Sequence, residues 1–113
     1  MLIDIKEKIE NTLKVEAEAL VLLSKSISEE MCQAVDLIYS TNARLIVTGI
    51  GKSAIVAQKI VATLNSTGTT AVFMHAADAI HGDLGMIGNG DIVLCISKSG
   101  DTPEIKVLVP LIK

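Results

Sequence analysis

The chain has 113 residues, of which 50% are hydrophobic, and a formal net charge of −3 at pH 7. Its acidic and basic residues are interspersed and its only aromatic residues are Tyr39 and Phe73, so it has neither a basic stripe nor a base-stacking surface for nucleic acid. No stretch reaches the ~18 uninterrupted apolar residues of a membrane span, and the charged N-terminus lacks the apolar core of a secretory signal. These observations predict a globular cytoplasmic chain that binds neither nucleic acid nor membrane.

The first 42 residues predict two amphipathic helices. The apolar residues of the first recur at three- and four-residue steps, as in a helix with one apolar face: Leu2, Ile5, Ile9, Leu13, Ala17 and Leu20. The run Ser26-Ile27-Ser28-Glu29 reads as a capping box that opens the second helix. That helix should stop near Asn42, which gives a helical hairpin over residues 1–42.

The pattern changes to alternating strands and helices over residues 43–113. We expect strands over 45–48, 70–74 and 92–96, because these are short apolar runs bounded by turn residues. A helix over 53–67 should end at Gly68 as its C-cap, and a short helix and a loop should follow the second strand. Thr102 is the expected N-cap of the last helix, with Pro103 at its first position, and Pro110 should kink or end that helix.

The predicted strands are continuous runs of valine, isoleucine and leucine. Such strands are buried on both faces, which is typical of a parallel sheet covered by helices on each side, an α/β fold. Three strands make a small sheet with an uncovered edge. We therefore expect the chain to be part of a larger domain or to need a partner.

A glycine-rich turn, Gly49-Ile50-Gly51-Lys52-Ser53, follows the first strand and opens a helix. A nucleotide-triphosphate loop needs a glycine where this chain has Ile46, so that interpretation is rejected. The spacing of Gly49, Gly51 and Ala54 fits a dinucleotide fingerprint, although only Asp78 lies near the place of the ribose-binding acid. A nicotinamide-dependent oxidoreductase therefore stays an alternative, as does a turn that only lets strand and helix pack closely.

A serine-rich turn, Ser97-Lys98-Ser99-Gly100-Asp101-Thr102, follows the third strand. Three hydroxyls surround Gly100 at a helix start, where backbone N–H groups favour an anion. This arrangement predicts a pocket for a phosphate monoester. The alternative is an ordinary serine-rich loop in which Thr102 only caps the helix.

Four segments together resemble the sugar isomerase (SIS) domain, and specifically the arabinose 5-phosphate isomerases that feed Kdo and lipopolysaccharide synthesis. The segments are residues 49–53, 65–68, 75–85 and 97–104. The resemblance implies a flavodoxin-like, doubly wound sheet in which the chain is the N-terminal part of a single SIS domain, truncated after the third strand and its helix. It also implies interconversion of ribulose 5-phosphate and arabinose 5-phosphate, without a cofactor, in a homo-oligomer that is a tetramer or a dimer.

The resemblance also suggests roles for individual residues. Isomerisation needs a base, a group that stabilises the enediolate and a proton relay. Glu104 is the candidate base, Lys52 the candidate enediolate or phosphate contact, and His81 the candidate for ring opening or hydroxyl proton transfer. The expected phosphate-binding residues are Gly51, Ser53, Ser97, Lys98, Ser99, Gly100 and Thr102.

Each of these roles has an alternative in the sequence. Glu104 also fits a helix-dipole acid, Lys52 a solvated lysine and His81 a histidine bonded to its own loop. His75 and Asp83 are expected to support the site rather than to touch the substrate, and the spacing of the two histidines and Asp83 matches no metal-ligand pattern, so no metal is expected. The alternative function is a sugar-phosphate sensor that binds in the same pocket without catalysis.

Overall fold

The structure is a computed structural model that describes residues 2–112, apart from the side chain of Asp83. By its internal contacts the chain divides into two compact units, Met1–Leu37 and Ile38–Lys113. No helix among residues 2–112 is both long and apolar enough to cross a bilayer.

The first unit contains α1 (Leu2–Ser24) and the first part of α2 (Glu29–Ser40). None of the described residues of α1 is buried, and the ion pair between Asp4 Oδ2 and Lys8 Nζ, 3.4 Å apart, lies on its surface. The predicted capping box is wrong by two residues. Ser28 caps α2, because its Oγ accepts the N–H of Met31 at 3.2 Å, whereas the Ser26 hydroxyl donates to the carbonyl of Leu23.

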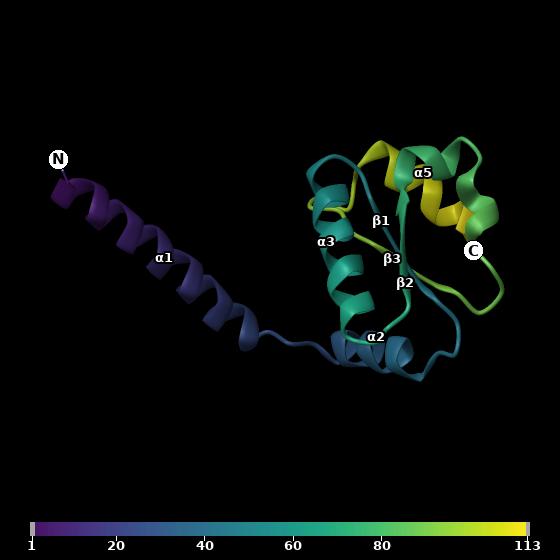
Figure 1. The fold of residues 1–113 in the computed structure, drawn as a ribbon, viewed down its shortest axis with the longest axis horizontal. Coiled ribbons are helices and arrows are strands. Elements are labelled where there is room, and N and C mark those ends of the chain that lie inside the picture. Colours follow the sequence, from purple (N-terminus) through teal and green to yellow (C-terminus); the bar gives the residue numbers. More distant parts are fainter. Residues whose placement is uncertain (1, 113) are drawn as a thin grey trace. The chain divides into compact units, whose positions relative to one another are not determined.

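The second unit is a three-layer α/β structure (Figure 1). Its elements follow in the order β1 (Leu45–Gly49), α3 (Lys52–Ser66), β2 (Ala71–His75), α4 (Ala76–Ile80), the 3₁₀ helix η1 (Asp83–Met86), β3 (Ile92–Cys95) and α5 (Pro103–Ile112). All three strands are parallel and their order is β2-β1-β3. Each strand and helix predicted over residues 43–113 is present, and the α/β class is confirmed.

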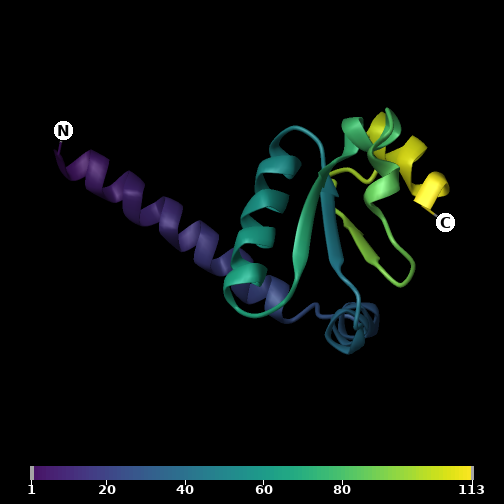
Figure 2. The same cartoon turned by 45° about the vertical axis from the view of Figure 1, so that its right-hand side comes forward.

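Every residue of β1 is buried because β1 is the central strand and both of its faces are covered. Leu45 and Val47 pack with Ala57 of α3 on one face. Ile46 packs on the other face with residues of α4 and α5, among them Ala79 and Leu108. Figure 2 shows α3 on one side of the sheet and α4 and α5 on the other.

The ends of α3 and α5 differ in part from the predicted ones. α3 ends with Thr67 as its C-cap, and Gly68 is the next residue, with φ +99°. A glycine in this place is the usual way to leave a helix, since it adopts positive φ without a steric cost. Of the two outcomes predicted at Pro110, a kink or an end of the helix, the end is wrong, because α5 continues to Ile112.

Candidate functional site

The two turns identified in the sequence lie at the carboxyl ends of neighbouring strands, β1 and β3. The hydrogen bond from the Ile96 N–H to the Thr48 carbonyl, 2.9 Å long, extends the pairing of these strands to the base of both turns. The chain moves from β1 to one neighbour, β2, and then to the other, β3, so β1 and β3 border the topological switch point of the sheet. Ligands of open α/β sheets bind in the crevice at such a point.

The first turn is shaped by two glycines with different roles. A Cβ on Gly49 would lie 3.0 Å from the backbone carbon of Ser53, so this glycine allows α3 to start close against the strand. Gly51 has φ +61°, and an added Cβ would meet nothing within 4 Å, so its backbone conformation is what favours glycine. Lys52 then begins α3 with an exposed side chain, and Ser53 behind it is half-buried.

The second turn folds back on its own hydroxyl groups. Ser97 Oγ accepts the Gly100 N–H at 3.0 Å and lies 3.0 Å from Thr102 Oγ1, while Ser99 Oγ accepts the Asp101 N–H at 3.1 Å. Gly100 lies at the bend with φ +70°. Ser97 and Thr102 are half-buried, whereas Ser99 and Gly100 are exposed. The loop therefore presents hydroxyls and backbone N–H groups together at one exposed bend.

The N-terminal end of α5 adds further donors to this loop. Its first helical hydrogen bond joins the Lys106 N–H to the Thr102 carbonyl at 3.0 Å. The N–H groups of Glu104 and Ile105 precede that bond, so they have no acceptor within the helix and carry the partial positive charge of the helix terminus. Glu104 is half-buried in the first turn.

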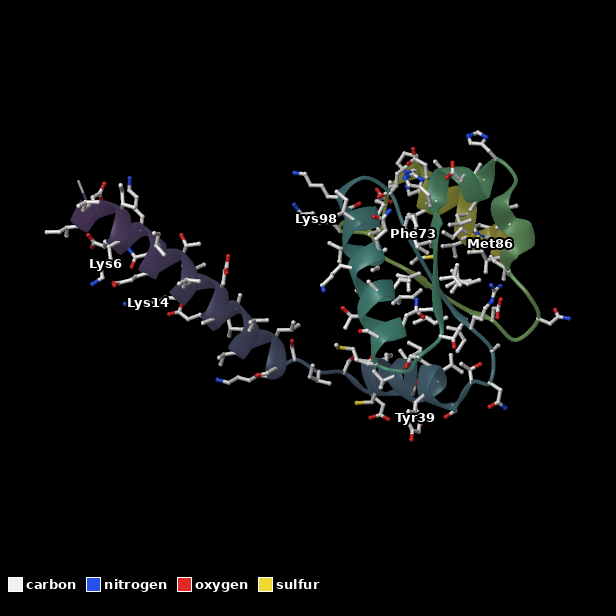
Figure 3. All side chains as sticks on the ribbon, viewed as in Figure 1. Lys6, Lys14, Tyr39, Phe73, Met86 and Lys98 are labelled. Carbon is white, nitrogen blue, oxygen red and sulfur yellow. The ribbon has the colours of Figure 1, made fainter. Side chains whose placement is uncertain are left out.

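The remaining charged groups around these turns point to solvent or to one another. Figure 3 shows Lys98 at the end of the second unit where α3 begins, and its side chain is exposed. Lys106 Nζ forms an exposed ion pair with Asp101, with 2.8 Å between the charged atoms. Within residues 2–112, no ion pair joins Lys52 to Glu104.

The two histidines lie on the connection that leaves β2. His75 Nδ1 accepts the N–H of Ala77 at 3.2 Å and so caps α4, and the ring of Phe73 meets the His75 ring edge-on at 6.3 Å between centroids. His81 is exposed and follows α4 directly. The Asp83 side chain lies outside the part of the chain that the structure describes.

The position of β2 decides how close these histidines come to the serine-rich turn. β2 is separated from β3 by the central strand, so the carboxyl end of β2 adjoins the glycine-rich turn, where His75 pairs in register with Gly49, and does not adjoin the serine-rich turn. α4 nevertheless packs against α5 through Ala76, Ala79, Ile105 and Leu108. This packing places α4 beside the helix that follows the serine-rich turn, whereas the place of His81 in the site stays a prediction.

Two polar features of the sheet were not predicted from the sequence. The Thr48 side chain is completely buried, and its hydroxyl has no hydrogen-bond partner among the described residues. Thr48 pairs in register with Cys95 of β3, and burial raises the pKa of the Cys95 thiol. Nothing in an apolar run with one threonine distinguishes a bonded hydroxyl from an unbonded one.

The second feature is a carboxylate at the opposite, amino-terminal end of the sheet. The Asp91 side chain is only 6% exposed, and the N–H of Gly88, the Arg44 guanidinium and the Arg44 N–H together lower its pKa to about 2. Its one sequence signal is an aspartate that closes the turn Gly88-Asn89-Gly90 immediately before a strand.

Comparison with known proteins gives a family and close relatives. The model of the SIS domain matches residues 37–113. The arabinose 5-phosphate isomerase KdsD of Pseudomonas aeruginosa is 43% identical over 111 residues, covering 98% of this chain and 34% of the relative. The corresponding enzyme of Francisella tularensis is 44% identical over 105 residues, covering 90% of this chain and 32% of the relative.

A solved structure agrees with these relatives. The structure of E. coli CFT073 c3406 in complex with arabinose 5-phosphate superposes with a TM-score of 0.88 at 36% identity, covering 96% of this chain and 57% of that chain. The chain thus spans about a third of the length of the curated relatives it matches.

Proposed function

Because the chain belongs to the SIS domain family, we propose that it binds a pentose phosphate at the switch point between β1 and β3. In this proposal it supplies part of the active site of an isomerase that interconverts ribulose 5-phosphate and arabinose 5-phosphate. The observation that carries the proposal is the serine-rich turn at the start of α5, where hydroxyls and backbone N–H groups gather at one exposed bend. Relatives with this activity are similar over nearly the whole chain.

The phosphate binds at the serine-rich turn by taking over its internal hydrogen bonds. The N–H groups of Gly100 and Asp101 now donate to serine hydroxyls, and a phosphate oxygen is a stronger acceptor than a hydroxyl because it is charged. The α5 terminus adds its N–H groups and its dipole. The contacts proposed from the sequence are Gly51, Ser53, Ser97, Lys98, Ser99, Gly100 and Thr102.

The sugar carbons then face the residues proposed for proton transfer. Glu104 removes the proton from C2 of the aldose, or from C1 of the ketose, and returns it to the other carbon. The Lys52 ammonium stabilises the negative charge that develops on the enediolate oxygen. His81 serves ring opening or proton transfer between the hydroxyls, with His75 and Asp83 as supporting residues.

The setting of the reaction is part of the proposal. We place it in the cytoplasm, in a homo-oligomer that is a tetramer or a dimer. It needs a small-molecule sugar phosphate and neither a cofactor nor a metal, because a carboxylate base and an ammonium group are sufficient for enediolate chemistry.

A ligand-binding experiment tests the phosphate assignment. Arabinose 5-phosphate should raise the melting temperature of the chain, since a ligand that binds only the folded state stabilises it by mass action, and NAD should not. Ser99→Ala should weaken the binding of arabinose 5-phosphate about five- to tenfold through the loss of one hydrogen bond. The control is Ser66→Ala, which removes an exposed serine hydroxyl that donates to its own helix. Stabilisation by NAD alone would overturn the proposal in favour of a dinucleotide site.

A second experiment separates an isomerase from a sensor. In a protein that joins this chain to the rest of the length of its relatives, Glu104→Gln should lower turnover at least about a hundredfold and leave the affinity for arabinose 5-phosphate nearly unchanged. Turnover that survives this change removes Glu104 from the role of base. Binding without any turnover in the parent protein identifies a sensor instead.

A further inference from the structure

The connection from β2 to β3 carries His81 and is held at both ends. It begins at the carboxyl end of β2, where His75 caps α4. It finishes at the amino end of β3, because Asp91 is the last residue before that strand. The segment between His81 and Ile87 therefore spans the distance between these two anchors.

The second anchor is a cluster of four residues, which we call the Arg44–Asp91 clamp: Arg44, Met86, Gly88 and Asp91. Asp91 Oδ2 accepts the Gly88 N–H at 2.8 Å and Arg44 Nη2 at 3.0 Å, and Oδ1 accepts the Arg44 N–H at 3.1 Å. The same Arg44 Nη2 donates to the Met86 carbonyl. The clamp thus ties the end of η1 and the following turn to the residue that precedes β1.

The start of the segment is held by α4, because the N–H of His81 donates to the carbonyls of Ala77 and Asp78 and the N–H of Gly82 donates to that of Ala79. The rest of the segment depends more on the clamp. His81 and Gly82 are exposed, and Gly82 has φ +140°. Leu84, Met86 and Ile87 pack only at the margin of the core that contains Ile46 and Leu108. A hydrogen-bonded carboxylate in a covered position holds its partners more firmly than marginal apolar contacts do, because breaking it leaves a desolvated charge without a partner.

We propose that Arg44 and Asp91 are positioning residues that hold residues 81–87 in place and thereby hold His81 for proton transfer. The structural part of this inference is that the two residues hold residues 81–87, and the catalytic part is that they thereby hold His81 for proton transfer. Only the catalytic part rests on the proposed function. The two residues lie at the amino end of the sheet, opposite the serine-rich turn, so they contact no phosphate in our assignment. Their loss should change the chemical step and spare the affinity for the sugar phosphate.

Hydrogen exchange measured by mass spectrometry on the full chain tests the structural part. Asp91→Asn keeps the shape of the side chain but cannot accept at its amide nitrogen, so amide exchange over residues 82–87 should accelerate about tenfold. Exchange over α3 should stay unchanged. The matched control is Asp101→Asn, which removes an exposed, ion-paired carboxylate of the same size and should leave residues 82–87 unaffected.

Two results would overturn this part of the inference. One is unchanged exchange over residues 82–87, and the other is equal acceleration everywhere, which would show only a loss of global stability. If Asp91→Asn does not fold, Arg44→Lys serves instead, since it keeps the positive charge and loses the two-pronged donor geometry.

Kinetics of the protein extended to the length of its relatives test the catalytic part. Asp91→Asn should lower kcat about tenfold while KM for arabinose 5-phosphate changes by less than about twofold, the pattern of a lost interaction in the chemical step. Unchanged kcat would refute a positioning role. A parent protein that neither binds nor converts arabinose 5-phosphate refutes the proposed function instead, and the exchange result then stands by itself.

Discussion

Gly49 is the last residue of β1, and its missing side chain is a packing requirement. A Cβ there would lie 3.0 Å from the Ser53 carbon, 3.1 Å from the Ser53 oxygen and 3.2 Å from the Ala54 nitrogen. All three are backbone atoms of the first turn of α3, so no side-chain rotation relieves the contact. Gly49 therefore fits the alternative interpretation of the glycine-rich turn, in which a glycine only lets the strand and the helix pack closely. At position 51, by contrast, glycine is favoured over other residues because φ is positive.

Gly49→Ala should therefore destabilise the chain by about 1–3 kcal/mol, the usual cost of forcing an extra carbon into a packed region. Denaturant unfolding followed by circular dichroism measures the change. The control is Gly85→Ala, where an added Cβ meets nothing within 4 Å and φ is not in the left-handed region. Equal stability of the two variants would show that α3 moves away from the strand without cost.

Thr48 is a buried hydroxyl that the fold leaves without a partner among the described residues. A desolvated polar group without a hydrogen bond lowers stability, so Thr48→Val, which keeps the shape and removes the hydroxyl, should stabilise the chain by about 1–2 kcal/mol. Thermal and denaturant unfolding measure this, with exposed Thr70→Val as the control. A destabilised Thr48→Val variant would mean that the hydroxyl is hydrogen-bonded in solution.

At the scale of elements, the turn before β3 is stabilised by the negative charge of the Asp91 carboxylate. The pKa of Asp91 is lowered from an ordinary value of 3.8 to about 2, first by the Gly88 N–H and then by the Arg44 guanidinium. A carboxyl group whose pKa is lower in the folded state contributes stability above its unfolded pKa and loses it as the pH falls through the folded value. The contribution of Asp91 is therefore complete above about pH 4 and lost between about pH 4 and pH 2.

The prediction is that the unfolding midpoint in urea, measured from pH 5 to pH 2, falls more steeply for the parent chain than for Asp91→Asn. Asparagine does not titrate, so the stability of the variant lacks the pH-dependent contribution of the Asp91 carboxylate. Asp101→Asn should retain the parent's steep fall, because Asp101 is exposed. Identical slopes for the parent and Asp91→Asn would contradict the assignment of the low pKa to the clamp.

The elements were predicted well where one local pattern determines them. The apolar runs at 45–48 and 92–95 are strands because a continuous run needs cover on both faces, and helices α3, α4 and α5 supply it. The apolar runs do not specify which strand lies beside which, so the order β2-β1-β3 comes from the structure. The clamp was missed because Arg44 and Asp91 are 47 residues apart and no local pattern joins them.

At the scale of the whole molecule, the sequence predicted the family and the fold, whereas the assembly of the site stays a prediction. The SIS family and the α/β fold are confirmed, and both turns lie at the carboxyl ends of adjacent strands. The roles of Lys52, His81 and Glu104 stay predictions, because they depend on the relative placement of three loops. That placement is set by helix packing and by the clamp, which are long-range contacts that motifs do not encode.

The exposed apolar side chains of α1 bear on whether copies of the chain associate in solution. All described residues of this 23-residue helix lie outside the buried core, and Leu13 and Leu20 are 59% and 67% exposed. An amphipathic helix gains stability by burying its apolar face against another element, and a large exposed apolar patch marks an interaction surface. We therefore expect copies of the chain to associate through α1.

Sedimentation equilibrium over a range of protein concentrations measures that association. The parent chain should sediment as an oligomer, and Leu13→Gln combined with Leu20→Gln should shift it toward the monomer, because each glutamine removes apolar area worth about 1.5–3 kcal/mol when buried. The control combines Asn11→Gln with Thr12→Gln, which changes two exposed polar residues of the same helix and should leave the oligomer intact. A parent chain that stays monomeric at every concentration would contradict the expected self-association, and an equal shift in both double variants would place the interface outside the apolar face of α1.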